Sequence, residues 1–324
     1  MDYGRVIVKV PASTANLGPG FDTLGMALNL YAWIDMSVSD ETRIELYGEK
    51  MDGVPRDKSN LVYKVAQLVF EEAGVSLPEL SIAMHSDIPL TRGLGSSATA
   101  IVCALTAANA LIGSPLSTDR LFQIATKLEG HPDNVGASLF GGIVVAAWDG
   151  QRADYIRLEP HPSLEVLVAI PDFQLSTEKA RHALPEQFSM EDTVFNVSRS
   201  SLLVAALASG SLELIKHAMK DRLHQPYRAP LIPGMTAILE QATDHGALGA
   251  ALSGAGPTLL MLVDARSSRK AELEQFVLAE LQREQISAQA IWLRPCLSGP
   301  EVTLLPRTQI HTTLAEWIKG EVSA

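Results

Sequence analysis

A glycine-rich loop followed directly by an apolar run is the feature that most constrains this chain. Residues 88–109 read IPLTRGLGSSATAIVCALTAAN, and the second half of this segment has a helical apolar pattern. Gly93 and Gly95 allow positive φ and a close approach of a ligand to the backbone. Ser96, Ser97 and the first N–H groups of the helix then direct donors at one anion. The segment predicts a phosphate loop, and a serine-capped glycine turn is the structural alternative.

Two better-known phosphate loops fit poorly. A Walker A loop ends in Gly-Lys-Ser/Thr, and this triplet does not occur in the sequence. The dinucleotide pattern matches Gly93–Ala98 loosely, but it should follow a strand directly and lead to an acidic residue about twenty positions later. Here Pro89–Arg92 intervenes and no acid occurs before Asp119. Neither a P-loop nor a Rossmann site is favoured.

Length and charge bound the remaining possibilities. The chain has 324 residues, 47% of them hydrophobic, which is enough for two domains. A net charge of −11 argues against non-specific nucleic-acid binding, and an acidic protein must gather positive charge locally to hold a polyphosphate. Two cysteines, Cys103 and Cys296, predict no disulfide framework. Without a signal-peptide pattern or an apolar stretch of membrane-spanning length, a cytoplasmic protein that binds neither membranes nor nucleic acids is expected.

Periodicity and turn residues predict a mixed α+β chain. Strands are expected at Arg5–Val10, Leu28–Ser37, Arg43–Tyr47, Leu80–His85, Gly142–Trp148, Leu164–Ile170, Gly249–Leu252, Thr258–Val263 and Ala288–Leu293. Helices are expected at Ser59–Ala73, Ser96–Leu111, Thr118–Leu128, Val194–Ser209, Leu212–Met219, Met235–Thr243 and Ser268–Arg283. Asp57 or Ser59 should cap the first helix. The polar stretch Asp149–Pro162 is the expected boundary between domains at residues 1–155 and 156–324.

Three motifs in order carry a resemblance to a known family. Residues 89–98 (PLTRGLGSSA) match the nucleotide loop of the GHMP kinases, which reads Pro-x-x-x-Gly-Leu-Gly-Ser-Ser-Ala. Residues 9–22 (KVPASTANLGPGFD) and 251–258 (ALSGAGPT) match two further motifs of that family. Within it, residues 11–25 and the segment His131–Val135 resemble the homoserine kinases in particular.

The resemblance implies a fold and a reaction. It implies an N-terminal α+β domain and a ferredoxin-like C-terminal domain, with ATP and substrate in the cleft between them. The reaction would be ATP-dependent phosphorylation of L-homoserine to O-phospho-L-homoserine, a step toward threonine, with Mg²⁺ as cofactor. A homodimer is one open possibility. Nucleotide binding is assigned to Pro89, Leu90, Thr91, Arg92, Gly93, Leu94, Gly95, Ser96, Ser97, Ala98 and Thr99.

The same resemblance assigns a metal site and catalytic residues. Ser97, with Ser96 as the less favoured choice, and Glu129 would hold Mg²⁺, which prefers oxygen ligands. A carboxylate at a helix C-terminus opposes the helix dipole, which favours a functional reason for Glu129. His131 and Asn134 would orient the δ-hydroxyl of homoserine, whose proton would pass to the phosphate. Asp133 acting as a general base is the alternative.

Homoserine is a zwitterion, so its site must pair an ammonium with acceptors and a carboxylate with donors. Asn16 and Asp22 suit the ammonium. For the carboxylate, the resemblance points to residues 176–181 and 225–230, which offer Arg181, Arg228 and the hydroxyl of Thr177. A guanidinium suits a carboxylate because it binds two oxygens at once. Adenosine is expected near Asn60–Tyr63 and Pro89–Arg92, while Gly254 and Gly256 would let the backbone approach the cleft.

Two other classes of function stay open. Ser176 and Lys179 match the Ser-x-x-Lys of penicillin-binding enzymes, although the companion Ser-Asp-Asn and Lys-Thr-Gly motifs are absent. A ligand-sensing pseudokinase would keep the fold without turnover. Intact Ser97, Glu129 and glycine motifs disfavour it, and Mg²⁺-dependent ATP turnover with and without homoserine separates these classes.

Overall fold

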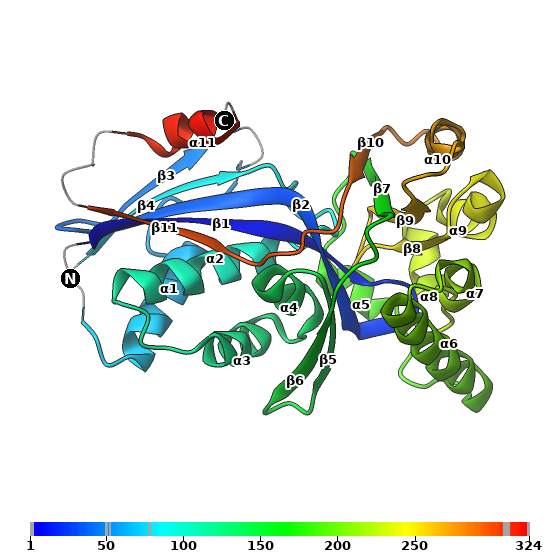
Figure 1. The fold of residues 1–324 in the computed structure, drawn as a ribbon, viewed down its shortest axis with the longest axis horizontal. Coiled ribbons are helices and arrows are strands. Elements are labelled where there is room, and N and C mark those ends of the chain that lie inside the picture. Colours follow the sequence, from blue (N-terminus) through cyan, green and yellow to red (C-terminus); the bar gives the residue numbers. More distant parts are fainter. Residues whose placement is uncertain (1–2, 49–50, 52, 77–78, 307–311, 323–324) are drawn as a thin grey trace.

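Two β-sheets standing side by side organise the chain (Figure 1). The computed structural model describes residues 3–48, 51, 53–76, 79–306 and 312–322. The first sheet has the order β11-β1-β2-β4-β3, with β5 pairing β2 and β6 pairing β5. Its strands are β1 (Tyr3–Asn16), β2 (Gly20–Ser39), β3 (Arg43–Tyr47), β4 (Glu79–Ser86), β5 (Ile143–Trp148), β6 (Ala153–Leu158) and β11 (Glu301–Pro306).

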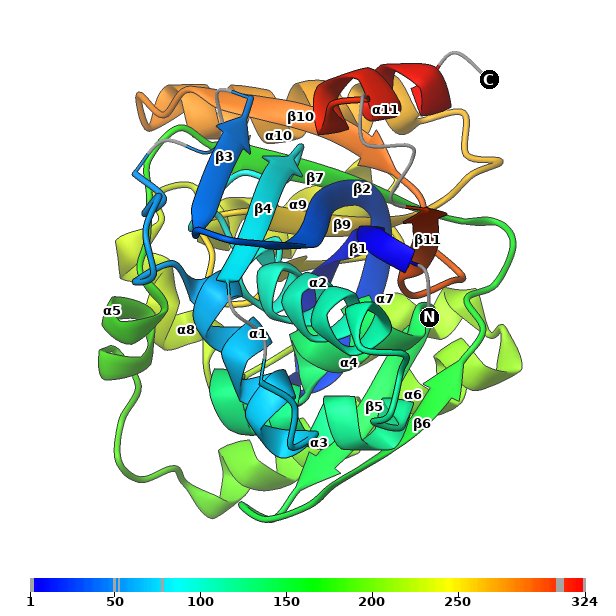
Figure 2. The ribbon, with the colours of Figure 1, turned by 90° about the vertical axis from the view of Figure 1, so that its left-hand side faces the viewer.

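Helices cover both faces of the first sheet. One face carries α1 (Leu61–Glu72), α2 (Ser96–Leu111), α3 (Thr118–Glu129) and α4 (Asp133–Phe140), and α11 (Leu314–Val322) lies on the other (Figure 2). Because side chains alternate along a strand, Val6 and Val8 of β1 join the core under α2, whereas Ile7 packs with Leu314. Helix α2 is apolar nearly all round, and its buried alanines let it pack closely against the sheet.

The second sheet has the order β10-β7-β9-β8, with every pair antiparallel. Its strands are β7 (Leu164–Pro171), β8 (Gly249–Leu252), β9 (Leu259–Asp264) and β10 (Ala288–Leu293). The accompanying helices are α5 (Thr177–His182), α6 (Met190–Ser209), α7 (Ile215–Ala218), α8 (Gln225–Arg228), α9 (Met235–Gln241) and α10 (Lys270–Arg283), with 3₁₀ turns η2 (Leu212–Leu214), η3 (Ala229–Leu231) and η4 (Ala242–His245). This βαββαβ arrangement confirms the expected ferredoxin-like C-terminal domain.

One apolar cluster joins the two sheets. It contains Leu24 and Leu28 of β2, Leu94 of the predicted phosphate loop, and Val166 and Leu260 of the second sheet. All five are buried to at least 99%. The cleft above this cluster is therefore bordered by elements of both sheets.

Several predicted bounds are confirmed, namely those of β3, β8, β10 and α2. Others need correction. Asn60 caps α1 by accepting from the N–H of Val62, while Asp57 instead accepts from Ser59 in the preceding turn. Helix α4 and the elements β11 and α11 were not predicted. Residues 133–139 are all buried, so α4 lacks the polar face that marks an amphipathic helix.

Most of the expected linker at Asp149–Pro162 belongs to a β-hairpin, because β6 extends to Leu158, and the chain then passes to the second sheet before β7 begins at Leu164. Asp149 accepts from the backbone N–H groups of Gln151 and Arg152, which is the turn chemistry that Asp-Gly favours between paired strands. The proposed domain boundary after residue 155 lies inside β6, and β11 returns from the C-terminal region to pair with β1. The division at residue 155 stays a prediction, and the strands change from the first sheet to the second between Leu158 and Leu164.

A buried ion pair links neighbouring strands of the first sheet. Arg5 donates to Asp35 from Nε at 2.9 Å, and the two side chains are 8% and 11% exposed. We predict that Asp35→Ala costs about 3–5 kcal/mol in unfolding free energy, because it leaves a buried guanidinium without its carboxylate. Urea denaturation measures this. Asp154→Ala, which removes a solvent-exposed partner of Arg152, should leave the midpoint near that of the wild type. Equal midpoints for both variants would contradict the prediction.

Candidate active site

The predicted phosphate loop lies at the N-terminus of α2 and lines a cavity between the sheets. Gly95 is the N-cap with φ 69°, and no side chain caps the helix. The N–H groups of the first turn have no intrahelical acceptor, so this end of α2 can receive an anion. Gly93, Gly95, Ser96 and Ser97 all line the cavity.

Glycine is required in this loop because other chain segments press against it. A Cβ on Gly95 would lie 2.2 Å from Ser13 Oγ and 3.0 Å from Asn134 Oδ1. A Cβ on Gly93 would lie 2.4 Å from the carbonyl oxygen of Ser253. Both glycines also have positive φ, which side chains disfavour.

The remaining predicted nucleotide residues divide into three groups. Thr91 lines this cavity, and Leu90, Thr91, Ser96 and Ser97 line an adjoining one. Leu94, Ala98 and Thr99 are fully buried, so they support the loop. Arg92 lines neither cavity, because its guanidinium donates to the carbonyl oxygens of Pro171 and Phe173. Pro89 is also absent from the lining of both cavities.

The adjoining cavity is the place where adenosine was expected. Asn60, Leu61 and Val62 line it together with Leu90 and Thr91, so the two predicted segments meet there. The other described residues that line it are largely apolar, with Trp33, Met51 and Met84 among them. An apolar slot beside a phosphate loop suits a nucleobase.

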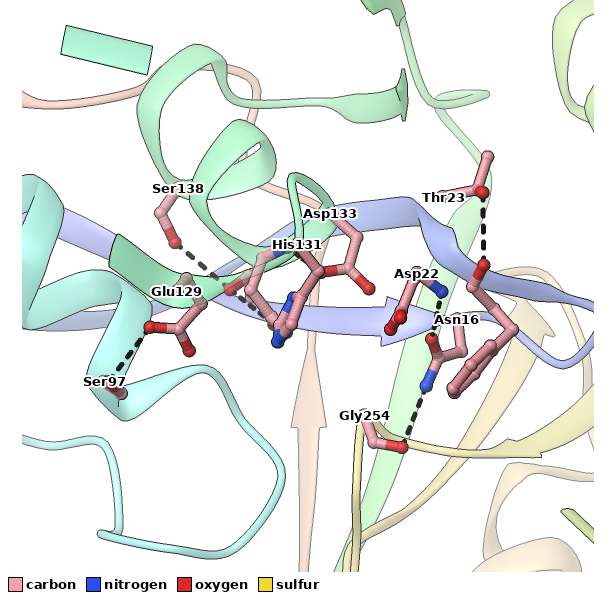
Figure 3. A network of polar contacts seen from close by, with 12 residues as sticks. Asn16, Asp22, Thr23, Ser97, Glu129, His131, Asp133, Ser138 and Gly254 are labelled. Atoms are coloured by element: carbon pink, nitrogen blue, oxygen red, sulfur yellow. Dashed lines mark hydrogen bonds and ion pairs between the residues drawn. The ribbon is translucent and has the colours of Figure 1, made fainter. Parts of the chain in front are cut away.

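The predicted metal ligands lie next to each other. Ser97 Oγ donates to Glu129 Oε2 at 3.1 Å, although the residues are 32 positions apart (Figure 3). Burial raises the pKa of Glu129 despite the nearby His131 and Ser97. A carboxylate that is partly desolvated gains from a cation, and a hydroxyl with a carboxylate is a suitable partial ligand set for Mg²⁺.

His131 and Asp133 form a close pair at the start of α4. His131 Nδ1 lies 2.5 Å from Asp133 Oδ1, which also accepts from the backbone N–H of Asn134. Burial lowers the pKa of His131, but the Asp133 carboxylate outweighs it and raises this pKa to about 9. His131 is therefore charged at neutral pH. Asn134 Oδ1 accepts from Ser13 Oγ at 3.0 Å, and both His131 and Asn134 line the cavity.

The residues predicted to bind opposite ends of a zwitterion contact each other. Arg181 donates from both terminal nitrogens to the two oxygens of Asp22, at 2.8 and 2.9 Å. Asn16, which was expected to bind substrate, lines the cavity, and its side chain also builds the loop. Its Oδ1 accepts from the N–H of Asp22, and its Nδ2 donates to the carbonyl of Gly254. Asn16 and Asp22 both have positive φ, so these bonds hold a strained turn.

Arg228 is buried, with 2% of its surface exposed, and carries its charge among neutral partners. Its Nε donates to Ala180, and its Nη1 donates to Gly254 and to the ring of His224. Burial, together with the positive charge of Arg181, lowers its pKa to about 10. Arg228 and Thr177 both line the cavity. A buried cation with no carboxylate bonded to it is suited to binding an anionic group.

The chain matches two family models, described as GHMP kinases N terminal domain over residues 60–142 and GHMP kinases C terminal over residues 203–281. A homoserine kinase of Deinococcus radiodurans is 49% identical over 81% of this chain and 85% of its own length. One from Moorella thermoacetica is 45% identical over 91% and 99%. The chain belongs to the homoserine kinase family.

Solved structures agree with this family assignment. The homoserine kinase of Cytophaga hutchinsonii superposes with a TM-score of 0.83 at 27% identity, covering 93% of this chain and 98% of that one. A mevalonate kinase superposes at 0.64 with 15% identity, which supports the fold alone.

Sequence reasoning missed two residues around the cavity. Phe21 lines it and lies under both arginines, with its ring centre 5.5 Å from Cζ of Arg181 and 5.2 Å from that of Arg228. His224 lies behind Arg228 and stacks on Phe21. Phe21 stands inside the family motif at residues 9–22, whereas His224 stands outside the motifs, and only the fold shows what the two residues contact.

We predict that Gly95→Ala abolishes nucleotide binding, because the new Cβ displaces Ser13 or Asn134 and with them the start of α2. Gly74→Ala is the matched control, since its φ of 65° resembles that of Gly95 but a Cβ there meets nothing within 4 Å. The control should lose about 1 kcal/mol of stability and keep its affinity for ATP. Titration calorimetry with ATP and Mg²⁺ measures the affinity of both variants. Unchanged affinity in Gly95→Ala would place the nucleotide elsewhere.

Proposed function

We propose that this chain transfers the γ-phosphate of ATP to the δ-hydroxyl of L-homoserine and so forms O-phospho-L-homoserine. The observation that carries the proposal is a single cavity with two chemically different ends. Ser96 and Ser97 at the N-terminus of α2 line one end, and Asp22, Arg181 and Arg228 line the other. Membership of the homoserine kinase family supports the same acceptor.

The charged end suits an α-amino acid. Asp22 and Arg181 pair with each other, and Arg228 adds a second positive charge, which is buried. A zwitterion matches this arrangement charge for charge, with its ammonium at Asp22 and its carboxylate at the two arginines. A ligand that lacks the ammonium opens the Asp22–Arg181 pair without replacing it, which leaves a carboxylate unpaired.

The phosphate end supplies the groups that phosphoryl transfer needs. The N–H groups at the start of α2 would hold the phosphates, as a helix N-terminus does for anions. Ser97 and Glu129 would hold Mg²⁺, which neutralises charge on the transferring phosphate when bound. His131 carries a proton at neutral pH and would donate a hydrogen bond between the two ends.

The proton of the acceptor hydroxyl has two possible destinations. Asp133 Oδ1 is already bonded to His131 and to the N–H of Asn134, so two protein donors compete with a substrate hydroxyl for this oxygen. We therefore favour transfer of the proton to the phosphate itself, with His131 and Asn134 orienting the hydroxyl. Asp133 as general base remains the alternative.

Other functions have less support. Ser176 Oγ caps α5 by accepting from the N–H of Lys179, so it is not arranged as an acyl-transfer nucleophile. A pseudokinase would not need the contact between Ser97 and Glu129. Among the described helices, none has both the length and the apolar composition to cross a bilayer. A cytoplasmic location, a role in threonine biosynthesis and a homodimer stay predictions.

The metal proposal predicts a loss of turnover in Glu129→Gln, which keeps the shape of the side chain and removes its charge. We expect kcat to fall by about 10², or roughly 3 kcal/mol, in a coupled ADP assay. Exposed Glu159→Gln serves as the control and should keep wild-type turnover. Near-normal kcat in Glu129→Gln would show that Glu129 does not hold the metal.

The substrate proposal predicts steep specificity. Homoserine should be phosphorylated, whereas mevalonate, galactose and 4-hydroxybutanoate, which all lack the α-ammonium, should not. Arg228→Leu should lose about 2–4 kcal/mol in kcat/KM for homoserine, the scale of a truncated charge-assisted pair. Exposed Arg266→Leu is the control. Comparable turnover of mevalonate, or an unchanged kcat/KM in Arg228→Leu, would leave a GHMP kinase with another acceptor.

A further inference from the structure

Arg228 directs only part of its guanidinium into the cavity. A guanidinium has five N–H donors. Three of them are used on neutral acceptors, namely the carbonyls of Ala180 and Gly254, at 3.2 and 3.1 Å, and His224 Nδ1 at 3.1 Å. The two on Nη2 have no protein acceptor among the described residues. These contacts therefore decide which edge of Arg228 a ligand meets.

His224 can hold Arg228 only as a neutral ring. The residue is fully buried, and its Nε2 donates to the carbonyl of Gly18 at 2.7 Å. Its Nδ1 must accept from Arg228, because a guanidinium nitrogen cannot accept. One proton on Nε2 and none on Nδ1 satisfies both partners.

The two hydrogen bonds of His224 connect the two groups that would bind the amino acid, namely Arg228 and the turn that carries Asp22. Gly18 begins the Gly18–Asp22 turn, which leads from β1 into the first residues of β2 and carries Asp22, while Arg228 ends α8. A Cβ on Gly18 would lie 2.2 Å from the carbonyl of Met219, so this turn has little room to move. Phe21 of the same turn stacks on His224 with ring centres 5.1 Å apart.

We propose that His224 is a positioning residue that holds Arg228 and the Gly18–Asp22 turn at the spacing a zwitterionic α-amino acid requires. It does not line the cavity, so it acts through Arg228 and not by touching substrate. The inference rests on the proposed function, because it assigns His224 to recognition of the amino acid and not of ATP.

Two variants separate the two bonds. An asparagine amide reaches the position of ring atom Nδ1, and a glutamine amide reaches that of Nε2. His224→Asn keeps the acceptor for Arg228, whereas His224→Gln keeps the donor for Gly18. We expect KM for homoserine to rise about tenfold in His224→Gln and less than about threefold in His224→Asn. KM for ATP should stay within about twofold of the wild type in both.

Steady-state kinetics with each substrate varied, with exposed His217→Asn as control, gives these values. Equal rises in KM for homoserine in the two variants, or a parallel rise in KM for ATP, would show a merely structural role and overturn the proposal. A wild-type protein that turns over ATP but not homoserine would overturn the proposed function and this inference with it. If the wild type phosphorylates homoserine, a negative result with the His224 variants contradicts only this inference and not the proposed function.

The dependence of stability on pH tests whether the ring of His224 is neutral in the folded protein. Burial lowers the pKa of His224 from its ordinary 6.5; Asp221 and Asp22 oppose this and Arg228 reinforces it. The unfolded chain therefore takes up this proton first, so the stability of the neutral ring is present above pH 6.5 and is lost as the pH falls. The urea midpoint of the wild type should fall more steeply between about pH 7 and pH 5 than that of His224→Asn. Equal slopes would overturn the neutral-ring role.

Discussion

Backbone contacts that only glycine permits hold the site together. A Cβ at Gly25 would lie 2.0 Å from the carbonyl of Asp133, and those at Gly93 and Gly95 would strike Ser253 and Ser13. These contacts bring the start of α2, the start of α4 and the turn before β9 to one place. Ser253 strengthens the junction, since its hydroxyl donates to the carbonyl of Gly93 at 2.5 Å and bonds Thr14 at 2.8 Å. The relative positions of the loop, the two helices and both sheets therefore depend on glycines that let chain segments approach without side chains between them.

Electrostatics then divides the cavity into two ends. The start of α2 favours anions, and Glu129 nearby provides a carboxylate that burial makes costly without a cation. At the other end Arg181 pairs with Asp22, and Arg228 lies over the same Phe21 ring as Arg181. His131 lies between these ends and is held as a cation by Asp133 (Figure 3). This distribution of charge is what makes one cavity suitable for both a polyphosphate and a zwitterion.

Local pattern predicted much of the fold, and its failures have physical causes. Strands that alternate and helices with an apolar face were found, with α2 and β10 at their observed bounds. Helix α4 was not predicted because it is buried on all sides, so its sequence shows no amphipathic periodicity. Strand β6 was not predicted because its exposed polar residues resemble those of a linker. It is a strand because it pairs with β5. Such pairing is set by partners distant in sequence, which periodicity does not report.

The sequence alone determined the chemical class of the protein. Glycines, serines and apolar runs act within one turn of the chain, so their spacing indicated an anion loop at a helix start and a family of kinases. Tertiary structure alone decided what the long side chains do. Arg92, expected at the nucleotide, donates to Pro171 and Phe173, and Asp22 pairs with Arg181 from 159 positions away. A guanidinium reaches whichever acceptor the fold brings near, and which acceptor that is depends on how distant segments pack.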